Sequence, residues 1–153
     1  MTPWIELTEA DITSQLSAPQ AELLISRPNR NQSGDALAAA IGEATALVRS
    51  AIRSVPTNTL SENEKAIPPE LRLTASVLAM SQLPVRIPGI ELSETQDDYI
   101  DDAESTLSRV RSGNLPITLP STPESSPDVR TSLGLEVARK RSPRISGDDL
   151  RGL

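Results

Sequence analysis

The sequence predicts an all-α protein: a small helical bundle with long loops, an extended C-terminal arm and one or two short strands at most. Apolar residues recur every three or four positions in Asp35–Val55, Leu71–Leu83 and Ile100–Val110, which is typical of amphipathic helices. Prolines and capping residues separate these stretches. From Ser121 onward the composition shifts to Pro, Ser, Arg and Asp.

The chain divides into three predicted segments. Residues 1–34 are expected to hold an extended start and two short helices, which begin near Thr8 and Ser17. Residues 35–120 form the core of the bundle, and residues 121–153 form the extended arm. The arm has little apolar content of its own, which suits a segment that becomes ordered when it binds a partner.

The longest helix is expected over Asp35–Val55, after a polar loop at Arg27–Gly34, with Ser33 or Asp35 as its N-cap. Arg49 and Arg53 lie on its polar side. Its apolar stripe consists of Leu37, Ile41, Ala44, Val48, Ile52 and Val55. Because one helix cannot bury such a stripe alone, later helices must supply the opposing faces.

The next helix, Leu71–Leu83, follows Pro68 and Pro69, which are well tolerated in a first turn. Apolar side chains surround nearly its whole circumference, so it is buried on more than one side. Either this helix is the centre of the domain, or one of its sides meets another subunit. We expect the aliphatic stripes together to exceed what one subunit can bury.

The remaining elements follow from local signals. Pro84–Leu92 is predicted to be an extended connector that its prolines keep out of helix. Ser93–Gln96 has the pattern of a capping box and opens the last helix, which stops at Gly113. Leu115–Leu119 is predicted to be either one short strand or, because of its internal proline, a free or edge segment.

Composition excludes several classes of protein. The chain lacks Cys, His and Phe, so its core must be aliphatic and it can form neither a disulfide nor a cysteine metal site. This composition fits a reducing compartment. Residues 1–6 resemble no signal peptide, and the longest apolar run, Ala36–Ile41, is far short of the roughly 20 residues of a membrane span. We therefore expect a soluble protein that has no contact with a membrane.

Charge is distributed unevenly around the net value of −6. Residues 1–120 carry 9 basic and 16 acidic side chains, and residues 121–153 carry 6 basic and 5 acidic ones. An acidic body argues against general phosphate binding, on which nucleic-acid affinity mainly depends. The basic run Arg139, Lys140 and Arg141 could bind nucleic acid, but it is short and has no stacking aromatics, so docking to an acidic protein surface is favoured.

No catalytic, cofactor-binding or metal-binding residue is predicted. The chain has no His base, no Cys nucleophile and no glycine-rich phosphate loop. A Ser–Lys dyad would have to use Lys65 or Lys140, both in predicted loops. The densest carboxylate cluster comprises Asp97, Asp98, Asp101, Asp102 and Glu104. It could hold a divalent cation, but a solvated face near a helix N-terminus explains it better, so we expect no enzyme activity.

Trp4 is either an anchor in a protein interface or a cap on the bundle, and the sequence does not separate the two. The predicted partner-binding residues are Trp4, Arg139, Lys140, Arg141, Leu150, Arg151 and Leu153.

The order of these elements follows a familiar pattern. The motifs that carry it are Leu7–Asp11, the Ala-rich Ala36–Val55, the Pro-x-x-Leu helix Pro68–Leu83, Tyr99–Leu107, Val110–Gly113 with Leu115–Leu119, and the closing Asp148–Leu153. The chain thereby resembles the Mu-type family of bacteriophage head-completion proteins, the head–tail adaptors of the neck. It departs from that family in lacking an aromatic pair at the end of the long helix and in ending with Leu153 where the family has an aromatic residue.

The resemblance implies a ring of twelve copies beneath the portal protein, with tail or neck proteins on its other side. Phage DNA would pass through the lumen without specific binding, and the acidic body would repel it. The arm would dock on the portal or on a neighbouring subunit, anchored by Leu150, Arg151 and Leu153. The protein would be assembled in the bacterial cytoplasm and end up in the neck of the virion.

Two other classes of function remain open. One is an assembly chaperone or regulatory binding module outside the virion, whose C-terminal tail captures a protein partner. The other is an enzyme that uses the Asp97–Glu104 carboxylates with a metal ion.

Overall fold

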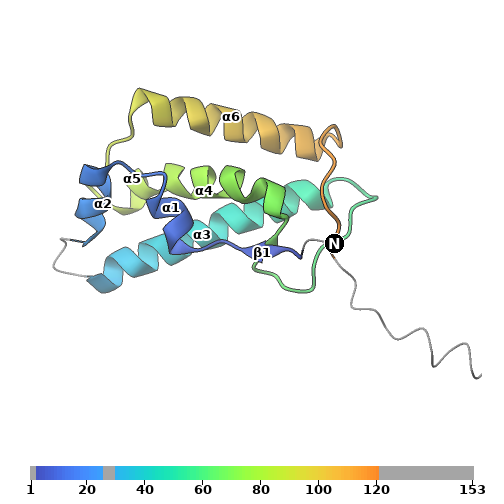
Figure 1. Cartoon of the computed structure of the whole chain (residues 1–153), viewed down its shortest axis with the longest axis horizontal. Coiled ribbons are helices and arrows are strands. Elements are labelled where there is room, and N and C mark those ends of the chain that lie inside the picture. The colour runs from blue at the N-terminus through green and yellow to red at the C-terminus, as the bar shows by residue number, and fades with distance from the viewer. Residues whose placement is uncertain (1–2, 26–29, 121–153) are drawn as a thin grey trace, which may run out of the picture. The chain divides into compact units, whose positions relative to one another are not determined.

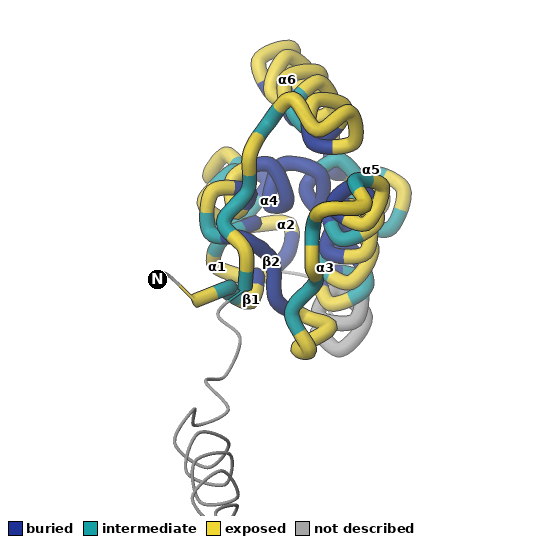
Figure 2. Tube along the Cα trace, turned by 90° about the vertical axis from the view of Figure 1, so that its right-hand side faces the viewer, coloured by how far each residue is buried: buried dark blue, intermediate teal, exposed yellow. Residues whose placement is uncertain are grey.

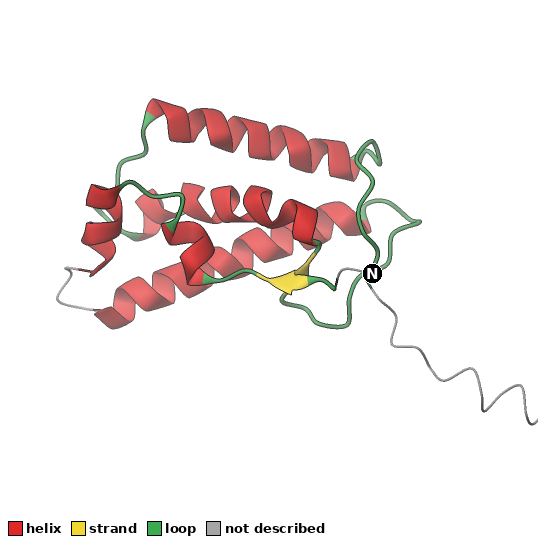
Figure 3. Ribbon diagram, viewed as in Figure 1, coloured by secondary structure: helices red, strands yellow, loops and turns green. Residues whose placement is uncertain are grey.

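The computed structural model describes residues 3–25 and 30–120, and this part of the chain is mostly helical (Figures 1 and 3). The elements are β1 (Ile5–Glu6), α1 (Glu9–Thr13), α2 (Ala18–Ile25), α3 (Arg30–Arg53), β2 (Ala66–Ile67), the 3₁₀ turn η1 (Pro69–Leu71), α4 (Arg72–Ser81), α5 (Leu83–Arg86) and α6 (Glu94–Arg111). The predicted small helical fold is confirmed. Residues 121–153, the predicted arm, lie outside the described residues.

Helix α4 lies at the centre of the bundle, packed against α3, α6 and α1 (Figure 2). Every residue from Thr74 to Met80 is buried, so the first of the two interpretations of this helix is correct. The other helices of the same chain cover this helix; that the aliphatic stripes together exceed what one subunit can bury stays a prediction. Only Leu73, 63% exposed, leaves a large apolar side chain of α4 in solvent.

The core is aliphatic, as the composition predicts. Helix α3 contributes a stripe that includes three alanines, Ala40, Ala44 and Ala51, and these small side chains allow α4 to approach closely. The largest side chains with almost no exposure include Ile12, Ile52, Ile67, Met80 and Leu83. Burial of an aliphatic side chain of this size contributes about 1.5–3 kcal/mol, so this set accounts for a substantial share of the driving force for folding.

The chain start is extended, as predicted, and strand β1 pairs antiparallel with β2, with Ile5 opposite Ile67 and Glu6 opposite Ala66. No strand forms at Leu115–Leu119, where one was considered. Pro116 has no backbone N–H to donate to a ladder, and the segment is held by side chains instead. β2 was not predicted, because a two-residue strand leaves no periodic signal.

Two predicted boundaries are wrong. Helix α3 begins at Arg30, inside the predicted polar loop. Once a helix is nucleated, extension by one turn costs only the weak propensity differences of Asn, Gln and Ser. Pro84 lies inside α5, where a helix was excluded. It occupies a first-turn position, at which a missing backbone N–H breaks no hydrogen bond.

The predicted capping box of α6 is confirmed. Ser93 Oγ accepts a hydrogen bond from Gln96 N at 3.3 Å, and Ser93 N donates one to Gln96 Oε1 at 2.9 Å. The helix ends before Gly113, whose φ of +75° is the left-handed conformation expected of a C-cap glycine. Both ends of α6 are therefore fixed by local sequence.

Candidate functional site

Trp4 is the one predicted partner-binding residue in the described chain, and it is half-buried. Its indole Nε1 donates a hydrogen bond to the Thr118 carbonyl at 2.8 Å. The Arg49 guanidinium carbon lies 5.9 Å from the ring centroid, within cation–π range. Trp4 thus joins the chain start, helix α3 and the segment after α6, as expected of a cap on the bundle. Its use by a partner stays a prediction.

Arg49 was predicted on the polar side of α3, but it is half-buried and holds the loop before β2. Its guanidinium donates to the carbonyls of Ser61 at 2.9 Å, Asn63 at 2.8 Å and Ala66 at 2.8 Å. Burial lowers the pKa of Arg49, partly offset by nearby Glu64. The group stays charged at neutral pH, so it fixes the loop with charge-assisted hydrogen bonds.

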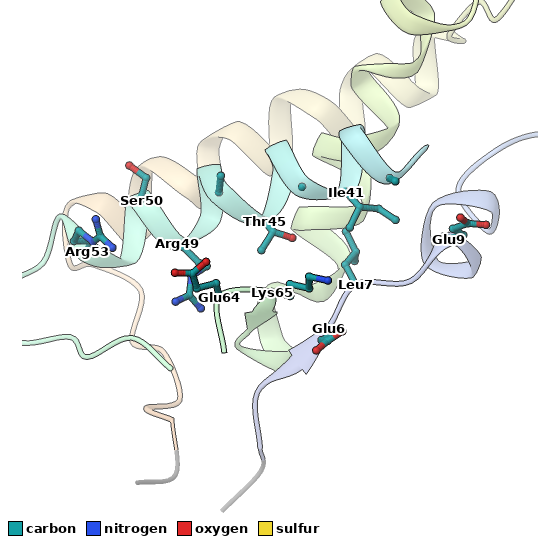
Figure 4. Close-up of a pocket in the computed structure, with 13 residues that line it drawn as sticks. Glu6, Leu7, Glu9, Ile41, Thr45, Arg49, Ser50, Arg53, Glu64 and Lys65 are labelled. Atoms are coloured by element: carbon teal, nitrogen blue, oxygen red, sulfur yellow. The ribbon is translucent and has the colours of Figure 1, made fainter. Parts of the chain in front are cut away.

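A groove of about 680 Å³ runs along the side of α3 next to this clamp (Figure 4). Its floor is formed by small or apolar residues of α3, and Leu7 closes the opposite side. The residues of the floor are Ala38, Ile41, Gly42, Thr45 and Ala46. A cavity of this size matches the range that binds small ligands or a short peptide segment.

Charged side chains surround the floor of the groove. Glu6 and Glu9 lie on the wall near β1 and α1, and Glu64 and Lys65 project from the loop before β2 (Figure 4). Arg53 lies beyond Arg49 at one end. Both signs of charge are present, and the carboxylates of Glu9 and Glu64 are exposed. The groove therefore combines a neutral floor with a charged rim.

The last described residues lie beside the same site. Thr118 is held from both sides, since its carbonyl accepts from Trp4 and its N–H donates to Glu70 Oε1. Trp4 in turn contacts Arg49, which lines the groove. The chain consequently leaves the described region next to one end of the groove.

Helix α6 presents a separate acidic face. The side chains of Glu94, Asp97, Asp98, Asp101, Asp102 and Glu104 are all exposed. Among residues 3–25 and 30–120 there is no group of three or more carboxylates arranged to hold a metal ion. Tyr99, 52% exposed, lies in the middle of this face.

The other predicted partner-binding residues lie outside the described residues: Arg139, Lys140, Arg141, Leu150, Arg151 and Leu153. The groove residues were missed, although one signal was available. Ala38, Gly42, Ala46 and Ser50 recur at intervals of four, which places four small residues in one row of a helix. The loop residues Glu64 and Lys65 had no such signal, because their place depends on tertiary structure.

No family model, curated protein or solved structure matches the chain. Within the described ranges, no helix is both long and apolar enough to cross a bilayer.

Proposed function

We propose that this protein is a structural component of a bacteriophage particle, a head–tail adaptor whose copies form a ring between the portal protein and the tail. The proposal rests on one observation: sequence motifs that carry the resemblance lie in or next to helices of the structure. Leu7–Asp11 leads into α1, the Ala-rich segment lies in α3, Pro68 and Pro69 precede α4, and Tyr99–Leu107 lies within α6. Each of these motifs lies in or next to a helix of the described chain, which supports the proposal.

A closed ring needs a heterologous interface, in which two different surfaces of each subunit meet. The groove beside α3 and the acidic face of α6 are two such surfaces, with different chemistry. The buried helix α4 is not available for this contact, so the ring would be built from the outer helices.

The acidic face of α6 also suits the wall of a DNA conduit. Like charges repel, so carboxylates at a lumen would keep phosphates from adhering as the genome passes. DNA would then be a passing ligand without specific contacts. The portal protein would lie on one side of the ring and tail or neck proteins on the other, which places the protein in the neck of the virion.

Electron microscopy of the full chain mixed with the portal protein of the same phage tests this proposal. We expect monomers or weak rings of the chain alone, and portal particles that carry an additional ring of about twelve copies after mixing. Persistent absence of an added ring, over a range of salt and protein concentrations, would contradict the adaptor function.

A matched pair of variants tests the predicted docking of the chain end. Arg151→Glu combined with Leu153→Asp should weaken ring formation on the portal, because it removes a cationic and an apolar anchor. Arg130→Glu makes the same change from a basic to an acidic residue elsewhere in the arm and should bind nearly as well. Equal binding by both variants would exclude the chain end as an anchor.

A further inference from the structure

The chain after α6 continues as an extended strap. Residues 115–120, which we name the strap, run from the end of α6 toward the start of the chain near β1 (Figure 1). Leu115 and Ile117 are half-buried and pack against the core, whereas Pro116 and Leu119 are exposed. The strap contains neither helix nor strand, so its position depends on tertiary contacts.

Two side chains from different elements bind the same residue of the strap. The indole Nε1 of Trp4, just before β1, donates a hydrogen bond to the Thr118 carbonyl at 2.8 Å. The Thr118 N–H donates to Oε1 of Glu70, which lies in η1. Both partners are far from Thr118 in the sequence. The strap therefore closes fully only when the chain start and η1 are both in place.

The indole also connects the strap to helix α3. The guanidinium carbon of Arg49 lies 5.9 Å from the centroid of the Trp4 ring, and the same guanidinium holds the loop before β2 through three carbonyls. When the strap opens, the indole N–H loses its acceptor, and a half-buried tryptophan usually needs such a partner. The fluorescence of Trp4 should thus report whether the strap is closed.

The strap is held by fewer kinds of contact than a helix. Helix α6 keeps its backbone hydrogen bonds within the element, and its buried Leu107 and Val110 fix it to the core. The strap depends on the half-buried Leu115 and Ile117 and on the two bonds of Thr118. Segments with few buried apolar contacts open locally at a lower free energy than the whole fold. The strap can therefore open while the helices stay intact.

We propose that the strap is a two-point latch, which opens and closes as one unit while the helices stay folded. The bonds of Thr118 to Trp4 and to Glu70 close cooperatively, because the first bond fixes the backbone of Thr118 and lowers the entropy cost of the second. Opening exposes Trp4 and Ile117, so the latch controls whether this apolar surface is presented to solvent. The latch does not depend on the adaptor function.

Native-state hydrogen exchange of the full chain, followed by NMR at the Thr118 amide, tests the proposal. Trp4→Phe keeps an aromatic ring beside Arg49 but removes the indole N–H. The Thr118 N–H is bonded to Glu70 and not to Trp4, so independent contacts would leave its exchange rate unchanged. The latch predicts exchange about three- to tenfold faster. An unchanged rate at Thr118 would overturn the proposal.

The coupling must also act in the opposite direction. Glu70→Ala removes a bond to Thr118 and none to the indole, yet it should increase acrylamide quenching of Trp4 fluorescence and shift the emission to longer wavelength. Glu70→Gln keeps an acceptor oxygen and should behave nearly like the parent chain. Equal quenching of the parent chain and Glu70→Ala would contradict a cooperative latch.

Matched controls separate the latch from general loss of stability. Tyr99→Phe removes a polar group from another aromatic ring, and Glu104→Ala removes another exposed carboxylate, both on α6; neither should alter Thr118 exchange or Trp4 quenching. The buried Leu107 amide of α6 should exchange at the parent rate in Trp4→Phe and Glu70→Ala. Equal acceleration at Leu107 and Thr118 would show that the strap opens only with the whole fold, which would overturn the proposal.

Discussion

Gln20 and Gln96 are polar side chains in a largely apolar interior, and each satisfies the other. Gln20 Nε2 donates to Gln96 Oε1 at 2.9 Å, and Gln96 Nε2 donates to Gln20 Oε1 at 2.8 Å. Their remaining amide hydrogens bind the carbonyls of Glu91 and Gln15. Each glutamine also accepts a hydrogen bond from the backbone N–H three residues earlier, at the start of its own helix.

Replacement of one glutamine should leave its partner unsatisfied in the interior. Gln96→Ala is expected to lower the free energy of unfolding by about 1–3 kcal/mol, as measured by urea denaturation. The double variant with Gln20→Ala should cost less than the sum of the two single variants, because one pair is lost in each case. Thr95→Ala, exposed in the same turn, is the control, and equal effects of Thr95→Ala and Gln96→Ala would contradict the role of the pair.

Replacement of Arg49 by lysine should destabilise the fold, although it keeps the positive charge. Lysine has no planar fork of donors and cannot reproduce the three carbonyl contacts. Arg49→Lys should destabilise the protein by about 1.5–3 kcal/mol and shift the fluorescence of Trp4, the only tryptophan of the chain. Arg53→Lys changes an exposed arginine one turn along and should alter neither property. An unchanged spectrum of Arg49→Lys would count against the clamp.

Asp11 makes stability depend on pH. Burial tends to raise the pKa of its carboxyl, but hydrogen bonds from Thr8 and the ion pair with Arg72, 2.8 Å from its Nε, hold the pKa below the ordinary value. A depressed pKa stabilises the fold above the unfolded pKa of about 4. This stabilisation is lost as the pH falls through the lower pKa of the folded state.

Asp11→Asn should therefore be less stable than the parent chain by about 1–2 kcal/mol at pH 7. The difference should shrink in acid, because the parent loses the same contribution on protonation. Urea midpoints at pH 7 and pH 3 measure both effects, with the exposed Asp102→Asn as the control. A difference that stays constant with pH would show that the charge of Asp11 is not responsible.

At the scale of elements, the sequence predicted correctly the features that depend only on residues close together in the chain. The cap at Ser93, the stop at Gly113 and the stripe of α3 depend on residues within a few positions of one another. The predictions missed helix α5 and the early start of α3. Whether a helix tolerates a proline such as Pro84, or a run of polar residues, depends on their position within the helix. The pairing of β1 with β2 and the contact of Gln20 with Gln96 are tertiary contacts that no local pattern encodes.

Substitution of two glycines distinguishes the effect of helix propensity on stability from the effect of backbone conformation. A Cβ atom would meet no neighbour at either Gly42 or Gly89, but Gly89 has φ = +95°. Gly42→Ala should raise the free energy of unfolding by about 0.5–1 kcal/mol. Gly89→Ala should lower it, because residues with a Cβ atom rarely adopt this conformation. Urea denaturation measures both, and destabilisation by Gly42→Ala would contradict the argument from helix propensity.

At the scale of the molecule, the sequence predicted a small acidic helical bundle, and the described chain has that fold. It did not predict the groove, because the groove forms where α3, the chain start and the loop at Glu64 and Lys65 come together. Trp4 was recognised as important, but its contacts with Arg49 and Thr118 require the fold. The adaptor function is a proposal that depends on the resemblance and on the helices in which its motifs lie.

The proposed adaptor function is tested most directly by quantitative mass spectrometry of purified, mature particles of a phage whose genome carries this sequence. We predict one copy for each portal subunit, since a ring seated on the portal shares its symmetry. A protein that is abundant in infected cells and absent from mature particles would contradict the adaptor function and favour an assembly chaperone.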